Sequence, residues 1–174
     1  MALSGVFPAT LQGVRFEETS TTALFPVGTA CVDNCGGQWL YVKAAATTPI
    51  YSLVNVTNAS IILGTWLVEL TTTTTIATGP KFLGIAQIAF AASDYGWIWR
   101  GPGGGYGRGI KVLAENATAG ALLTTLASPA GSVDDANVDE GVIAGLTTLV
   151  TTTTNAATEV QATTIIACNL TEVD

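Results

Sequence analysis

The sequence of residues 84–102, GIAQIAFAASDYGWIWRGP, alternates in its first half between two sets of side chains. A period of two predicts a strand with two distinct faces. Residues 94–96 predict a reversal of the chain, and a second strand then carries Trp97 and Trp99 on one face. Two tryptophans two positions apart form a rigid apolar stripe, which suits either a core or an interface.

From Phe25 onward, short apolar segments alternate with turn signals rich in Gly, Pro and Asn. They predict about nine short strands, at residues 38–43, 50–56, 61–70, 83–91, 96–100, 109–114, 121–126, 142–150 and 163–168. Residues 116–126 would also suit a short helix, but Gly120 disfavours one by about 1 kcal/mol. The pattern predicts an all-β fold, a single antiparallel β-barrel or sandwich.

Residues 1–24 lack sustained periodicity and contain a polar run before Phe25. They predict an extended N-terminal arm, followed by a β-domain over residues 25–174. An extended arm gains little by folding on itself, so its apolar side chains are expected to dock on a neighbouring chain. These side chains are Val6, Phe7, Leu11 and Phe16. A frayed terminus followed by an edge strand is the alternative.

Charged residues make up only 11% of the chain, against about 25% in typical domains. A small domain with so few charges is expected to cover part of its surface with other chains. The formal net charge is −7, and the six basic residues are scattered, which disfavours binding to nucleic acid. Arg100, Arg108 and Lys111 lie close together in sequence around a glycine-rich loop. A solvated loop is the favoured interpretation there, and an acidic partner surface is the alternative.

Residue types that carry chemistry are few. The chain has no histidine, which removes the commonest general base and the commonest metal ligand. The glycine loop at residues 101–109, GPGGGYGRG, fits neither of the two common nucleotide-binding patterns. Four carboxylates lie within residues 131–141, where a solvated acidic turn is favoured over a Ca²⁺ loop. We therefore expect no catalytic residue, no cofactor and no metal ion, and an enzyme is the least favoured class.

The three cysteines are one short of a structural zinc site. A disulfide between Cys31 and Cys35 would need an oxidising medium, and free thiols are expected in a cytoplasm. Residues 60–68 are apolar but too short to span a bilayer, and the first residues do not have the pattern of a signal peptide. A soluble protein made in a cytoplasm, with no membrane partner, is expected.

Three pairs of segments resemble the head decoration (cement) proteins of tailed bacteriophages. They are residues 25–29 with 36–44 (FPVGT and GGQWLYVKA), 84–90 with 94–98 (GIAQIAF and DYGWI), and 110–114 with 142–148 (IKVLA and VIAGLTT). The similarity lies in strand and turn residues and includes no catalytic signature. It implies a small all-β virion protein on the outer surface of the phage head. Such a protein bridges adjacent subunits of the major capsid protein, often as a trimer.

Within this interpretation, the four arm residues are expected to contact the capsid. Trp97, Trp99 and Tyr106 are expected near an oligomer or capsid interface, with a plain core position as the alternative for the tryptophans. A carbohydrate-binding or fibre-head domain that contacts the host is a rival function, because the same aromatics suit a glycan site. A structural subunit of the tail or baseplate is the third possibility.

Overall fold

The computed structural model describes residues 15–33, 36–72, 82–101, 110–126, 128–135, 142–143, 146–148, 151–152, 158–164 and 172–173. Within these residues there are thirteen β-strands and one five-residue helix, so the predicted all-β class is confirmed. In chain order the elements are β1 (Ala30–Val32), β2 (Gln38–Ala44), β3 (Leu53–Val56), α1 (Asn58–Ile62), β4 (Leu67–Leu70), β5 (Phe82–Ala86), β6 (Tyr95–Trp99), β7 (Lys111–Ala114), β8 (Leu123–Thr125), β9 (Val133–Asp135), β10 (Val142–Ile143), β11 (Leu146–Thr148), β12 (Thr158–Thr164) and β13 (Glu172–Val173).

The single strand predicted over residues 61–70 is wrong in its first half. The chain there completes helix α1 and turns before β4 begins at Leu67. Gly64 and Trp66 have φ angles of 71° and 46°, in the left-handed region that extended strands do not use. The backbone N–H groups of Thr65 and Trp66 both donate to the carbonyl of Ser60, which closes the turn.

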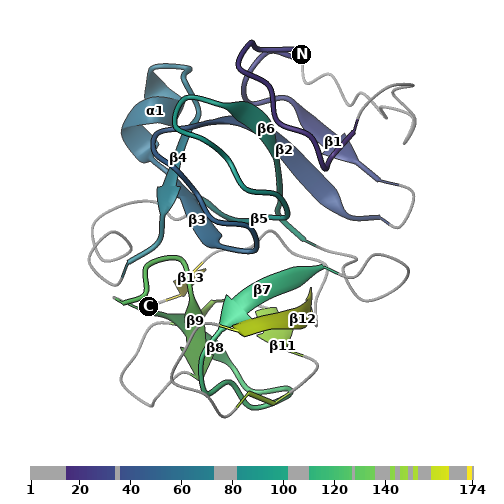
Figure 1. The fold of residues 1–174 in the computed structure, drawn as a ribbon, viewed down its shortest axis with the longest axis vertical. Coiled ribbons are helices and arrows are strands. Elements are labelled where there is room, and N and C mark those ends of the chain that lie inside the picture. The colour runs from purple at the N-terminus through teal and green to yellow at the C-terminus, as the bar shows by residue number, and fades with distance from the viewer. Residues whose placement is uncertain are drawn as a thin grey trace.

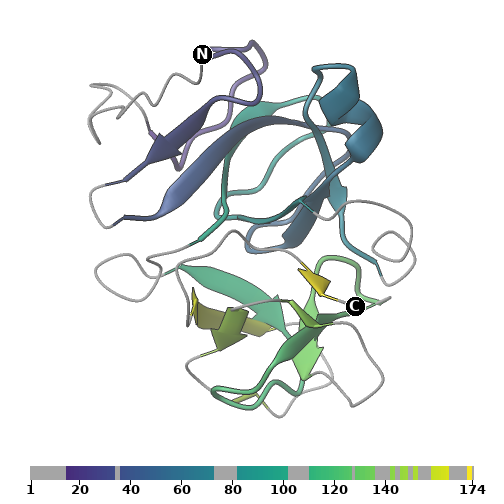
Figure 2. The same cartoon turned by 180° about the vertical axis from the view of Figure 1, so that it is seen from behind.

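Five strands close into a small barrel. Their order is β2-β4-β3-β5-β6, and the pairing of β2 with β6 completes the ring. The β2–β4 pair is parallel and the other four pairs of the ring are antiparallel. Strand β1 adds to β2 outside the ring. Figures 1 and 2 show this barrel as one half of the molecule, with α1 at its far corner.

Side chains of one parity fill the inside of the barrel. They form one buried cluster, contributed by all five strands and by the chain after β5: Leu40, Val42, Ala44, Val54, Val56, Val68, Ala86, Phe90 and Ile98. Two glycines make room within this narrow space. A Cβ atom on Gly84 would lie 2.6 Å from Cδ1 of Ile98, and one on Gly96 would lie 2.7 Å from Cε1 of Phe90.

Side chains of the other parity form an apolar row on the outside of the barrel. Strand register places Leu53 opposite Ile85, Ile85 opposite Trp99, Trp99 opposite Trp39, and Trp39 opposite Cys31. Each of these five residues is at most 3% exposed. A row of this kind on the outside of a barrel must be covered by other parts of the chain, because apolar area is costly to leave in water.

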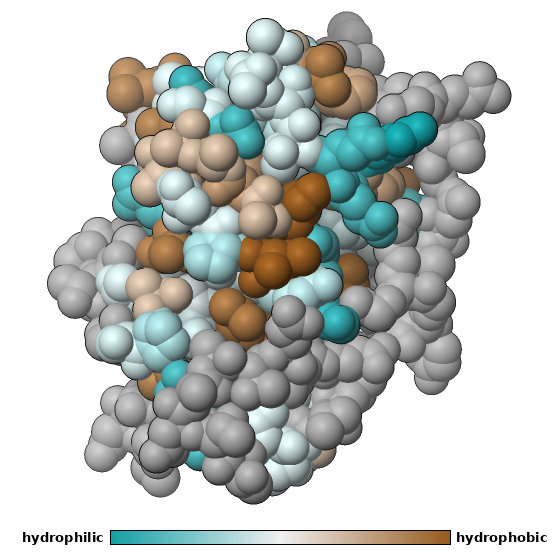
Figure 3. Space-filling view, in the orientation of Figure 1, coloured by the Kyte–Doolittle hydropathy of each residue, from teal (hydrophilic) through white to brown (hydrophobic). Residues whose placement is uncertain are grey.

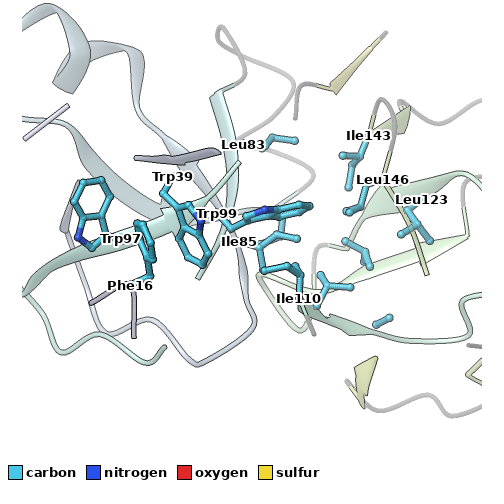
Figure 4. Close-up of a cluster of buried hydrophobic side chains, with 14 of the residues drawn as sticks. Phe16, Trp39, Leu83, Ile85, Trp97, Trp99, Ile110, Leu123, Ile143 and Leu146 are labelled. Carbon is cyan, nitrogen blue, oxygen red and sulfur yellow. The ribbon is translucent and has the colours of Figure 1, made fainter. Parts of the chain in front are cut away.

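The second half of the molecule covers one part of this outer face. Its five-stranded sheet has the order β11-β12-β7-β9-β8, and β10 pairs with β13 beside it. The apolar side chains of this half belong to the same buried cluster as the outer face of the barrel (Figure 4). They include Ile110, Val112, Leu123, Ile143 and Leu146.

Hydrogen bonds join the two halves directly. The side-chain amide of Gln87 donates to the carbonyl of Lys111 at 2.8 Å and accepts from the N–H of Lys111 at 3.1 Å. The N–H of Leu113 donates to the carbonyl of Tyr51 at 2.9 Å. The backbone of Gly131 bonds both to β3 and to the chain just after β4. The barrel and the second sheet therefore share a core and a bonded seam.

Residues 15–27, here called the N-terminal strap, cover the other part of the outer face. Phe16 lies in the buried cluster, and Phe25 and Val27 pack against it. Ser20 exchanges two backbone hydrogen bonds with Tyr95 of β6, at 2.8 and 2.9 Å. The strap is thus attached to the barrel by both packing and backbone pairing.

Candidate functional site

The predicted tryptophan pair lies in the core of the chain. Trp97 and Trp99 are 1% and 0% exposed. In Figure 4, Trp97 lies beside Phe16 at one end of the cluster, and Trp99 lies nearer to Ile110 of the second half. This corrects the expectation of an intermolecular contact in favour of the core alternative, since a partner could reach neither indole without displacing the residues that cover it.

Phe16 is also a core residue of its own chain. It is 7% exposed and stacks on Trp39, with 4.6 Å between ring centroids, and it meets Trp97 edge-on at 5.5 Å. This corrects the expectation that Phe16 docks on another chain. The reason is that the outer face of β2 and β6 presents enough aromatic surface to bind the strap locally. The other predicted contact residues, Val6, Phe7, Leu11 and Tyr106, lie outside the described residues.

The aromatic face of the barrel is therefore an interface within one chain. Tyr41 links its parts: its ring centroid lies 5.1 Å from that of Trp97 and 5.3 Å from that of Phe25. The Tyr41 hydroxyl also accepts a hydrogen bond from the N–H of Leu24 in the strap. The alternation in the sequence predicted the apolar stripe correctly, but the predicted contact with another chain is wrong, because the strap and the second sheet cover that face.

Large apolar side chains do stand exposed elsewhere among the described residues. Ile62 and Leu63, at the end of α1, are 77% and 76% exposed. The others lie singly at different places in the sequence: Leu24, Val32, Phe82 and Leu122. Figure 3 shows hydrophobic side chains at the upper left, over α1. We call Ile62 and Leu63 the α1 tip.

A turn closed by hydrogen bonds supports the α1 tip. The hydroxyl of Ser60 donates to the carbonyl of Thr57 at 2.7 Å and also reaches the carbonyl of Leu67 at 3.3 Å. The indole of Trp66 lies across Gly28, where an added Cβ would be 2.4 Å from the ring. Sequence reasoning missed the α1 tip because it read residues 61–70 as a strand. The signal that marks it is a glycine, Gly64, placed just after a short apolar run, as at helix ends.

The acidic and thiol groups near β1 have structural surroundings. Asp33 is buried and accepts two hydrogen bonds of 2.9 Å, from the N–H of Gly37 and from Nε1 of Trp39, so its carboxylate holds the β1–β2 turn. Cys31 carries a free, buried thiol, and burial raises the pKa of this thiol. A raised pKa keeps the thiol protonated and lowers its reactivity at neutral pH. Cys35 and Cys168 lie outside the described residues.

The carboxylates that were expected in a solvated turn lie partly in a strand. Asp134 and Asp135 belong to β9 and pair with β8. Oδ1 of Asp135 accepts a 2.7 Å hydrogen bond from the N–H of Thr118, so this carboxylate braces a neighbouring loop. Among the described residues no group of three His, Cys, Asp or Glu side chains is placed to hold a metal ion. Asp139 and Glu140 lie outside these residues.

Three basic side chains lie over aromatic rings. Nζ of Lys43 is 5.4 Å from the ring centroid of Tyr95, and Nζ of Lys111 is 5.0 Å from that of Tyr51. The guanidinium of Arg100 lies 4.8 Å from the ring centroid of Phe82, and its Nε donates to the carbonyl of Leu83. Burial lowers the pKa of this guanidinium. Arg100 is therefore partly desolvated, not part of a freely solvated loop, and Arg108 lies outside the described residues.

Comparisons with known proteins add no assignment: no family model, no curated protein and no solved structure matches this chain. In the part of the chain that the structure describes, no helix has the length and apolar character needed to cross a membrane.

Proposed function

We propose that this chain is a capsid decoration protein, which binds the outer surface of a bacteriophage head and bridges adjacent subunits of the major capsid protein. The proposal starts from the resemblance of its strand and turn segments to the head decoration proteins. The observation that carries it furthest is the α1 tip, a neighbouring pair of exposed aliphatic side chains on a chain of low charge. Such a surface suits adhesion to another protein.

The physical task of a decoration protein fits these properties. Packaged DNA strains the shell, and a clamp across subunit seams raises the free energy needed to separate them. Buried apolar area contributes about 25 cal/mol per Å². Contacts made at two points on one shell reinforce each other, because the second contact forms within an already bound complex. A net charge of −7 suits the outer surface better than the DNA-facing one.

The N-terminal arm expected over residues 1–24 is part of this proposal only over residues 1–14, because Phe16 belongs to the core. Residues 1–14 join the strap at Arg15, next to the anchored Phe16. We propose that Val6 and Phe7, with Leu11, contact the capsid, whereas Phe16 only anchors the arm to its own barrel. Trimer formation and the major capsid protein as partner belong to the same proposal.

The glycan-binding alternative loses two of its three aromatic candidates, because Trp97 and Trp99 are buried. No observation among the described residues favours it, or a tail or baseplate role, over the decoration function.

Binding to empty shells tests the proposal. Shells assembled from the major capsid protein of the same genome are mixed with the purified chain, sedimented and assayed for saturable occupancy. We expect occupancy at a fixed number of copies per shell, and weaker binding after deletion of residues 2–14, which leaves Phe16 in place. If the full chain stays in the supernatant, the proposal fails; if the deletion changes nothing, only the arm assignment fails.

A further inference from the structure

We propose that the α1 tip inserts into an uncharged apolar pocket of the shell protein, as a second attachment point beside the arm. This inference rests on the decoration function proposed above and names the chemistry of the contact. It concerns Ile62 and Leu63, which are 77% and 76% exposed at the end of α1.

The backbone that carries the two side chains is held by hydrogen bonds and by the packing of neighbouring residues. Ser60 is buried; its backbone carbonyl accepts the N–H groups of Thr65 and Trp66, and its hydroxyl donates to the carbonyls of Thr57 and Leu67. Ile61, the residue before the tip, and Trp66, just after it, pack against the core of the barrel. A contact carried on a fixed backbone has a smaller ordering cost on binding than one carried on a mobile loop.

The composition around the tip specifies the partner surface. Residues 57–66, TNASIILGTW, contain no charged side chain. A charged pocket would lose its hydration against this segment without gaining an ion pair. The fitting pocket is therefore apolar and uncharged.

The size of the tip indicates which kind of occupant covers it. A stable dimer of free proteins buries about 800 Å² on each partner, and two side chains supply only a small part of that area. The tip alone therefore does not hold two copies of this chain together. It adds to affinity where another contact already tethers the chain to the same partner, which is the situation of a two-point attachment to a shell.

The double variant Ile62→Ser with Leu63→Ser tests the inference in the full chain. Burying one Ile or Leu side chain is worth about 10- to 150-fold in a binding constant. We therefore expect Kd for empty shells to rise by roughly 100-fold or more. Leu24→Ser and Leu122→Ser are matched controls, because these side chains are 68% and 54% exposed at other sites. Both should bind shells as the wild type does, and all variants should unfold at the same urea concentration as the wild type.

The outcomes separate the two proposals. Equal binding by the double variant and the wild type overturns the tip contact and leaves the decoration function standing. A wild type that does not bind shells overturns both. The tip contact is also overturned if light scattering finds a wild-type dimer that the double variant dissolves, or if the wild type binds phosphatidylcholine vesicles and the variant does not.

Discussion

Glycine positions decide how tightly the barrel is packed. Gly84 lies on β5 opposite Val54, and its missing side chain leaves the space that Cδ1 of Ile98 fills. The backbone of Trp99 is also close, 3.1 Å from where a Cβ would lie. A close-packed interior has no spare volume for a methyl group at such a position.

Gly84→Ala is therefore expected to lower the free energy of unfolding by about 1–3 kcal/mol. The methyl group would meet the terminal carbon of Ile98, which the barrel wall confines. Urea denaturation followed by circular dichroism measures the change. Ile98→Val removes Cδ1, the atom that the new methyl group would meet. The double variant should therefore lose less stability than the two single variants lose together. Additive effects would contradict this packing argument.

At the scale of elements, the N-terminal strap and the second sheet divide the outer face of the barrel between them. The strap holds through Phe16, stacked on Trp39, and through the backbone pairing of Ser20 with Tyr95. Removing the strap would leave Trp39 and Trp97 in water, although both are now buried. The strap therefore stabilises the barrel, and it also positions the start of the arm.

Phe16→Ala should cost about 3–5 kcal/mol of stability, because it removes a buried aromatic ring and leaves a cavity. The tryptophan emission should also shift to longer wavelength as water reaches Trp39 and Trp97. Phe16→Leu keeps most of the apolar volume and should lose much less. An emission spectrum and a urea midpoint unchanged in Phe16→Ala would show that the strap does not cover the aromatic face in solution.

On the scale of the whole molecule, the two halves are expected to unfold as one cooperative unit. One buried cluster runs from Phe16 through Trp99 to Leu146 (Figure 4). The amide of Gln87 bridges the halves with two hydrogen bonds to Lys111. Since neither half has a separate core on that side, unfolding one exposes the apolar face of the other.

Gln87→Ala should lower the free energy of unfolding by about 1–3 kcal/mol, because the backbone N–H and carbonyl of Lys111 both lose their side-chain partner. Fluorescence of the barrel tryptophans and far-ultraviolet circular dichroism should still report one shared transition. Gln87→Glu keeps an acceptor for the Lys111 N–H but, ionised at neutral pH, sets its other carboxylate oxygen against the Lys111 carbonyl, so it should also be destabilising. Two separate transitions in the wild type would contradict the single unit.

The sequence by itself determined the all-β class and most strand positions, because alternation of side chains follows directly from strand geometry. It also determined an apolar stripe at Trp97 and Trp99, but the intermolecular interface predicted for these two residues is wrong. Only the tertiary structure decided what covers that stripe. Both faces of β6 are apolar, and a period of two cannot distinguish the inside of a barrel from an outside that Phe16 and Ile110 later cover. The sequence also failed to predict the α1 tip, because Ile62 and Leu63 have the composition of a buried strand. Their exposure follows from the short helix and from the left-handed turn at Gly64 and Trp66.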